Sequence, residues 1–163
     1  MTGDWTEALL GRWAALRPEL DLGPYLVTAR ISRIAQHLAR SQEETFARFG
    51  LNRGEVGVLS ALRTAGARDR PSPTRLFKGL MLSSAGMTKR LDNLEARGLV
   101  RRAPDPDDRR GVRLQLTPEG RRVVDRAVAA NTSVEGRLLE GLTAQDRKLL
   151  AELLKKLLAS IEP

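Results

Sequence analysis

The sequence predicts a mainly α-helical protein in which one short β-hairpin interrupts a series of helices. Along most of the 163 residues, apolar side chains recur at intervals of three and four, the spacing of one helix face. Over residues 112–116 the interval changes to two, which is typical of a strand. Proline and glycine separate these stretches where helices commonly begin or end. A chain of this length can bury a hydrophobic core without disulfide bonds.

Two helices are expected at the start of the chain. Apolar residues at helical spacing predict the first over residues 9–16, and Pro18 ends it. Pro24 suits the first turn of the second helix, which Gly50 can end in the left-handed conformation. A helix of about 25 residues is about 37 Å long. Because one small domain does not need that length, we expect its end to pack against another part of a dimer.

Three short helices are expected in the middle of the chain. A break from Gly66 to Pro73 separates the first two, Ser83 can cap the third, and Gly98 can end it. Three short helices within about 45 residues suggest helix-turn-helix packing. The apolar positions of the three are Val56, Leu59 and Leu62, then Leu76, Phe77 and Leu80, then Met87, Leu91 and Leu94.

A β-hairpin and two helices complete the predicted elements. Leu99 and Val100 begin one strand, residues 104–111 form a polar turn, and residues 112–116 form the second strand. Thr117 and the proline after it start a helix. The last helix begins at Thr143 with a capping box. Its six leucines within ten residues exceed what a terminal helix needs inside one chain, so we expect them to pack against a partner chain.

This order of elements is that of a winged helix-turn-helix with a helical dimerisation region. We expect residues 1–52 to hold an added N-terminal helix and a long dimerisation or linking helix. Residues 53–117 would form the DNA-binding region, and residues 118–163 the C-terminal dimerisation helices. The recognition-type helix is the one before the hairpin, because an α-helix fills the major groove while a thin hairpin can reach the minor groove.

The net charge of +8 is concentrated in this middle part of the chain. Residues 63–122 contain 15 basic and 7 acidic side chains, whereas the rest of the chain contains 13 of each. A basic segment between neutral flanks favours a polyanionic partner, because cations near phosphate release condensed counterions. The absence of cysteine and the single histidine exclude thiol and histidine-pair chemistry, so we expect no enzyme, metal site or cofactor. No leader or membrane span is evident, so we expect a cytoplasmic protein.

The helical wheel divides the recognition-type helix into faces. Opposite its apolar face lie Ala85, Lys89, Asp92 and Asn93. Lys89 is therefore expected to point toward a groove. Arg90 lies at the border, where it could serve either DNA or an interior pocket. Small side chains in the first turns let backbone amides approach phosphate, and these are Ser83, Ser84, Gly86 and Thr88.

Residues 82–120 read LSSAGMTKRLDNLEARGLVRRAPDPDDRRGVRLQLTPEG, which resembles the recognition helix and wing of the multiple antibiotic resistance regulator (MarR) family. Asp108-Arg109-Arg110, followed after five residues by Leu116-Thr117, matches the wing signature of that family. The resemblance implies a homodimeric repressor that binds a pseudo-palindromic duplex and releases it when a small molecule binds. It also implies that Arg110 enters the minor groove and that Asp108 pairs nearby to hold the wing.

The N-terminal helix resembles that of the urate-responsive branch of the family. This resemblance implies a ligand site formed by Trp13, Arg90 and Arg102, which suits a planar aromatic anion. The stretch GEVGVL has Gly57 where the branch pattern has an aspartate, so the acceptor for a ring N–H is missing. That difference disfavours urate and leaves another aromatic anion, or no ligand, open.

The sequence thus predicts a DNA-binding transcriptional regulator, with a repressor favoured over an activator. Two other functions remain open. The fold can serve as a protein-interaction module whose last helix and basic face bind an acidic protein. It can also serve as an architectural DNA binder with little sequence preference.

Overall fold

The computed structural model describes residues 3–65, 84–104 and 112–162. Contacts divide the chain into two compact units, Met1–Glu44 and Thr45–Pro163. The predicted helix around Leu76 and the tip of the predicted hairpin lie outside the described residues. Within the described ranges, no helix is long and apolar enough to cross a bilayer.

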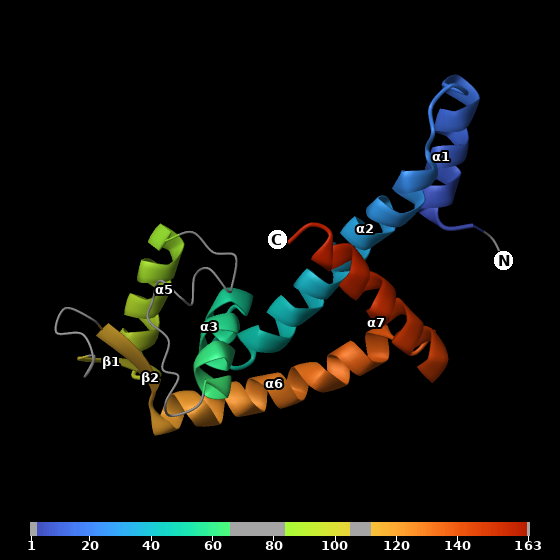
Figure 1. The fold of residues 1–163 in the computed structure, drawn as a ribbon. Helices are drawn as coiled ribbons and strands as arrows, with labels where there is room; N and C mark the ends of the chain where they lie inside the picture. The colour runs from blue at the N-terminus through green and yellow to red at the C-terminus, as the bar shows by residue number, and fades with distance from the viewer. Residues whose placement is uncertain (1–2, 66–83, 105–111, 163) are drawn as a thin grey trace. The chain divides into compact units, whose positions relative to one another are not determined.

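The N-terminal unit contains α1, Trp5–Leu16, and most of α2, Gly23–Ala47. In Figure 1, α1 lies beside the first turns of α2. The Asp4 side chain caps α1 by accepting a hydrogen bond from the backbone N–H of Glu7 at 2.9 Å. Its other carboxylate oxygen accepts from Arg30 Nε at 2.7 Å. This one side chain therefore fixes the start of α1 and ties that helix to α2.

The end of α2 leads into the second unit. Thr45 and Phe46 are buried there, and Gly50 has a φ of +66°, the left-handed conformation that ends the helix as predicted. Helix α3, Arg53–Thr64, follows with a capping box in which Asn52 and Glu55 exchange hydrogen bonds. The residues of the hydrophobic core are Phe46, Leu51, Val56, Val58, Leu59, Leu62, Leu91, Leu94, Leu99, Val100, Leu114, Val124 and Ala127.

Helix α5, Ser84–Ala96, and a two-stranded antiparallel sheet complete the middle of the chain. The strands are β1, Val100–Pro104, and β2, Val112–Leu116. Val100 pairs with Leu116 at the base of the hairpin, and Pro104 pairs with Val112 at its other end. Gly98, with a φ of +67°, reverses the chain between α5 and β1. Figure 1 shows the sheet beside the end of α5. The predicted hairpin and the predicted stop at Gly98 are therefore confirmed.

Helix α6, Pro118–Leu138, starts at the base of the hairpin. Thr117 caps it, and its hydroxyl also donates to the carbonyl of Gly98 at 2.6 Å. A Cβ on Gly120 would lie 1.9 Å from the carbonyl oxygen of Leu99, so only glycine allows this close approach of helix and strand.

The last helix, α7, Ala144–Ala159, has the predicted capping box between Thr143 and Asp146. No residue of α7 is buried. Its six leucines are between 39% and 59% exposed, so the chain alone does not cover this apolar stripe.

Candidate functional site

The outer face of α5 is polar and lies next to the hairpin. Leu91 and Leu94 fill the core, whereas Lys89, about 160° around the helix from Leu91, is exposed as its position predicts. Thr88 is also exposed, and Gly86 is half-buried. Ser84 is the first residue of the helix. The remaining predicted DNA-binding residues, Ser83, Asp108, Arg109 and Arg110, lie outside the described residues.

A buried carboxylate holds α5 against the turn before α3. Glu55 is 2% exposed, and its Oε1 accepts hydrogen bonds from Asn93 Nδ2 at 2.9 Å and Arg97 Nη1 at 3.1 Å. Arg97 also donates through Nη2 to the carbonyl of Gly50 at 2.5 Å. Asn93 is exposed, as its position opposite the apolar face predicts, and its amide also reaches the buried carboxylate.

The sequence contained one signal for this cluster. The N-x-x-E pattern of residues 52–55 is a capping box, which places the acid on the first turn of α3. Its long-range partners on α5 have no such local signature.

Arg102 on β1 binds the exposed side of α5. Its Nη2 donates to Asp92 Oδ1 at 2.6 Å, its Nη1 pairs with Glu95, and its backbone N–H donates to Glu95 Oε1 at 3.0 Å. The hydrogen bond that Arg102 donates to Asp92 is the main cause that raises the pKa of Arg102. Arg102 therefore connects the wing to the recognition helix and neutralises two acids on it.

Arg90 lies on a different side of the same helix. Its Nη1 donates to the carbonyl of Gly86 at 3.3 Å, and its guanidinium lies against Gly54 at the start of α3. A Cβ at Gly54 would lie 2.6 Å from that guanidinium. Since Arg90 and Asp92 are about 160° apart around α5, the guanidiniums of Arg90 and Arg102 contact opposite sides of the helix. In this conformation the two predicted ligand residues hold different partners, and a shared site for them stays a prediction.

Trp13, the third predicted ligand residue, belongs to the N-terminal unit, whereas Arg90 and Arg102 belong to the second unit. It is 47% exposed and lines a cavity of about 590 Å³ between α1 and the start of α2. The other lining residues of this cavity also come from the N-terminal unit. A site made of all three predicted residues therefore remains a prediction.

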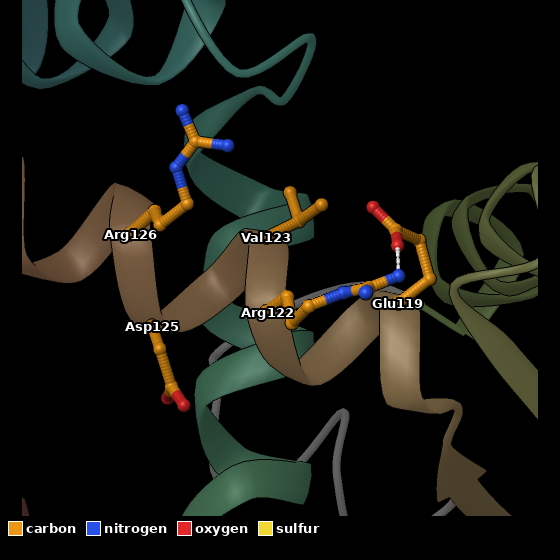
Figure 2. A pocket seen from close by; sticks show the side chains of 5 residues that line it. All are labelled: Glu119, Arg122, Val123, Asp125 and Arg126. Atoms are coloured by element: carbon orange, nitrogen blue, oxygen red, sulfur yellow. Dashed lines mark hydrogen bonds and ion pairs between the residues drawn. The ribbon is translucent and has the colours of Figure 1, made fainter.

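A second cavity, of about 510 Å³, lies along the first half of α6. Figure 2 shows Arg122 reaching along the helix to Glu119, with which it forms an ion pair. Asp125 accepts from Arg63 Nε of α3 at 2.8 Å. Opposite charges thus pair around this cavity, and we assign no ligand to it. Its walls are formed by Glu119, Arg122, Val123, Asp125 and Arg126.

The family model described as MarR family matches residues 49–111. PecS, an HTH-type transcriptional regulator from Dickeya dadantii, is 34% identical over 146 residues, which span 90% of this chain and 88% of PecS. The chain belongs to the MarR family. A mutant MarR from E. coli, solved in complex with operator DNA, has a TM-score of 0.73 and 28% identity, covering 85% of this chain and 99% of that one. The MepR-DNA complex of S. aureus, with a TM-score of 0.74 and 21% identity over 82% of this chain and 97% of that one, supports the fold.

Membership in the MarR family confirms the predicted fold class, a mainly α-helical winged helix-turn-helix. Members of this family are DNA-binding transcriptional regulators and not enzymes, as expected for this chain. The narrower resemblance to the urate-responsive branch stays a prediction.

Proposed function

We propose that this MarR-family chain is a cytoplasmic, homodimeric repressor that binds operator DNA through α5 and the β1–β2 hairpin. The observation that carries this proposal is the polar face of α5, where Lys89 is exposed while Leu91 and Leu94 anchor the opposite face in the core. A helix held in this way can enter the major groove without losing its packing. The operator complex of E. coli MarR supports the proposal.

In this proposal, residues 1–52 and 118–163 form the dimer and residues 53–117 contact DNA. The uncovered leucine stripe of α7 supports a partner chain, because a contiguous apolar face is stabilised by burial. Two-fold symmetry then places the two recognition helices about 34 Å apart, one turn of B-DNA. Arg110 at the tip of the wing is proposed to enter the minor groove, with Asp108 and Arg109 beside it.

We also propose that a small aromatic anion releases the duplex by drawing on Trp13, Arg90 and Arg102. Arg102 now neutralises Asp92 and Glu95 on α5. An anion that bound the guanidinium of Arg102 in place of Asp92 and Glu95 would leave both carboxylates without their counter-charge. The recognition helix would then repel phosphate, and the affinity for DNA would fall.

The test is a selection of bound duplexes from random DNA, followed by fluorescence anisotropy with the selected and a scrambled duplex. We expect the wild type to prefer the selected duplex, and its affinity to fall steeply with salt. Lys89→Ala is expected to reduce discrimination at one base pair, by about 1–3 kcal/mol. Arg110→Ala is expected to abolish tight binding, whereas Arg12→Ala, which removes an exposed cation from α1, is the matched control.

Two outcomes would favour the other functions. Equal affinity for the scrambled duplex would indicate an architectural DNA binder. A folded dimer that binds no duplex at any salt concentration would indicate a protein-interaction module.

A further inference from the structure

The cavity in the N-terminal unit has the size and the lining of a small-molecule site. Its volume, about 590 Å³, lies within the range of about 300–1,000 Å³ that is usual for such sites. Three aromatic side chains line it, Trp5, Trp13 and Tyr25, together with aliphatic residues of α1 and α2. All of them lie within residues 5–29, so the cavity is complete inside one unit.

The charge of this cavity is negative. Among the described residues that line it, Asp21 is the only carboxylate, and none is a lysine, an arginine or a histidine. One oxygen of its carboxylate, Oδ1, accepts from the backbone N–H of Gly23 at 2.9 Å, at the start of α2. The second oxygen has no hydrogen bond to the described residues, so it can accept one from a ligand.

The nearby arginines do not reverse this charge. Arg30 is bound to Asp4 at 2.7 Å, and the guanidinium of Arg33 lies 5.0 Å from the centroid of the Trp5 ring. Neither is among the residues that line the cavity. An anion would therefore meet a carboxylate and no cation in the wall.

A buried hydroxyl in the wall has no partner. Thr6 lines the cavity, is 1% exposed, and its Oγ1 makes no hydrogen bond with any described residue. Buried hydroxyl groups are nearly always hydrogen-bonded in folded proteins, since an unmade bond costs stability. The oxygen itself is almost inaccessible, so a polar group of a ligand can pair with it only after the Thr6 side chain rotates toward the cavity.

From these observations we propose that the cavity binds a planar aromatic amine, neutral or cationic, and disfavours aromatic anions. The ring stacks against the tryptophans, and an N–H or ammonium group donates to the free oxygen of Asp21. The faces of Trp13 and Tyr25 add an attraction for a cation, whereas the ring of Trp5 already has Arg33 over it. This site shares Trp13 with the anion site proposed above but needs neither Arg90 nor Arg102, and it does not rest on the DNA-binding role.

Three probes with the same ring test the charge preference: tryptamine, a cation; indole, neutral; and indole-3-acetate, an anion. Binding to the full chain is measured by isothermal titration calorimetry. We expect tryptamine to bind at least about fivefold more tightly than indole, and indole-3-acetate to bind most weakly. Equal or tighter binding of indole-3-acetate would overturn the proposal. No binding of tryptamine would also overturn it.

One variant and a matched control test the role of the Asp21 carboxylate. Asp21→Asn keeps a side-chain oxygen that can accept from the Gly23 N–H but removes the charge, and is expected to abolish the preference for tryptamine over indole. Glu19→Gln, which alters a neighbouring acid outside the cavity, is the control and is expected to leave the preference unchanged. An unchanged preference in Asp21→Asn would overturn the proposed role of this carboxylate.

Thr6→Val replaces the orphan hydroxyl with a methyl group of similar size. We expect the variant to have an equal or higher Tm and a severalfold weaker affinity for tryptamine, because the ligand loses one hydrogen bond. A lower Tm with unchanged affinity would show that Thr6 has a structural role only. Anisotropy of the selected duplex in the same samples reports DNA binding separately, so failure of either proposal is recognised independently.

Discussion

Glu55 is a buried acid whose hydrogen bonds cross between two helices. It accepts from Asn52 at the turn before α3 and from Asn93 and Arg97 on α5. A buried carboxylate is stable only with such partners, because its desolvation cost is otherwise too high. The position of the recognition helix is therefore coupled to one side chain that is almost fully buried.

Glu55→Gln is expected to destabilise the second unit by about 2–3 kcal/mol, because the amide cannot accept all of these hydrogen bonds and leaves buried donors unpaired. Urea unfolding followed by circular dichroism measures this loss. Glu140→Gln, at an exposed acid, is the control and is expected to change stability by less than about 0.5 kcal/mol. A similar stability for both variants would contradict the role assigned to Glu55.

In the proposed function, Arg102 acts on DNA through its ion pairs with Asp92 and Glu95 rather than through phosphate. We therefore expect Arg102→Met to lower the affinity for the selected duplex while the slope of affinity against salt stays the same. A lost phosphate contact would reduce that slope by about 0.9. Adding Asp92→Asn and Glu95→Gln to Arg102→Met is expected to restore most of the affinity. A reduced slope, or no rescue by the added changes, would refute this account.

At the scale of elements, α6 and the hairpin meet with no space for a side chain. Gly120→Ala would place a methyl group onto the carbonyl of Leu99, and we expect a loss of about 1–3 kcal/mol. Gly136 on the same helix has open space around it, so Gly136→Ala is expected to be neutral or stabilising by up to about 1 kcal/mol. Thermal unfolding of both variants tests the difference, and equal losses would speak against the close contact.

The junction of α1 and α2 should respond to acid. The hydrogen bond from Arg30 is the main cause that lowers the pKa of Asp4 below its usual 3.8. Because the folded pKa is the lower one, this stabilisation is complete above about pH 4 and is lost as the pH falls through the folded pKa. Both tryptophans of the chain lie in α1, so their fluorescence reports this unit. We expect Asp4→Asn to weaken the acid transition seen by fluorescence, whereas Asp146→Asn, at the cap of α7, leaves it unchanged.

Local patterns in the sequence predicted most elements, because caps, breaks and periodicity are properties of neighbouring residues. Gly50, Gly98, Thr117 and Thr143 all end or begin elements as expected. The cluster around Glu55 and the contacts of Arg102 were not predicted, since their partners are set by packing between distant segments. The wheel placed Arg90 at a border, and its contact with Gly54 depends on how α3 and α5 pack.

At the scale of the whole molecule, the uncovered face of α7 predicts assembly. Leu153 lies within this stripe and is 54% exposed in the single chain. We expect Leu153→Glu to shift the mass measured by light scattering from two chains toward one, because a buried charge opposes association. Lys155→Glu, a larger change in charge on the same helix, is expected to leave the dimer intact. A wild-type protein of single-chain mass would exclude the proposed dimer.

The base of the hairpin is held against the start of α6, and this contact limits which parts of the hairpin can change. The backbone N–H of Thr117 donates to the carbonyl of Leu99 at 3.1 Å, and Gly120 lies against the same carbonyl. The base of the hairpin is thus fixed against the start of α6, so a change in the tilt of the strands would disturb α6 as well. In the proposed function, a change of operator preference is therefore expected to come from the residues between the strands rather than from the strands. Grafting those residues from a relative is expected to transfer its base preference and to leave the melting temperature nearly unchanged.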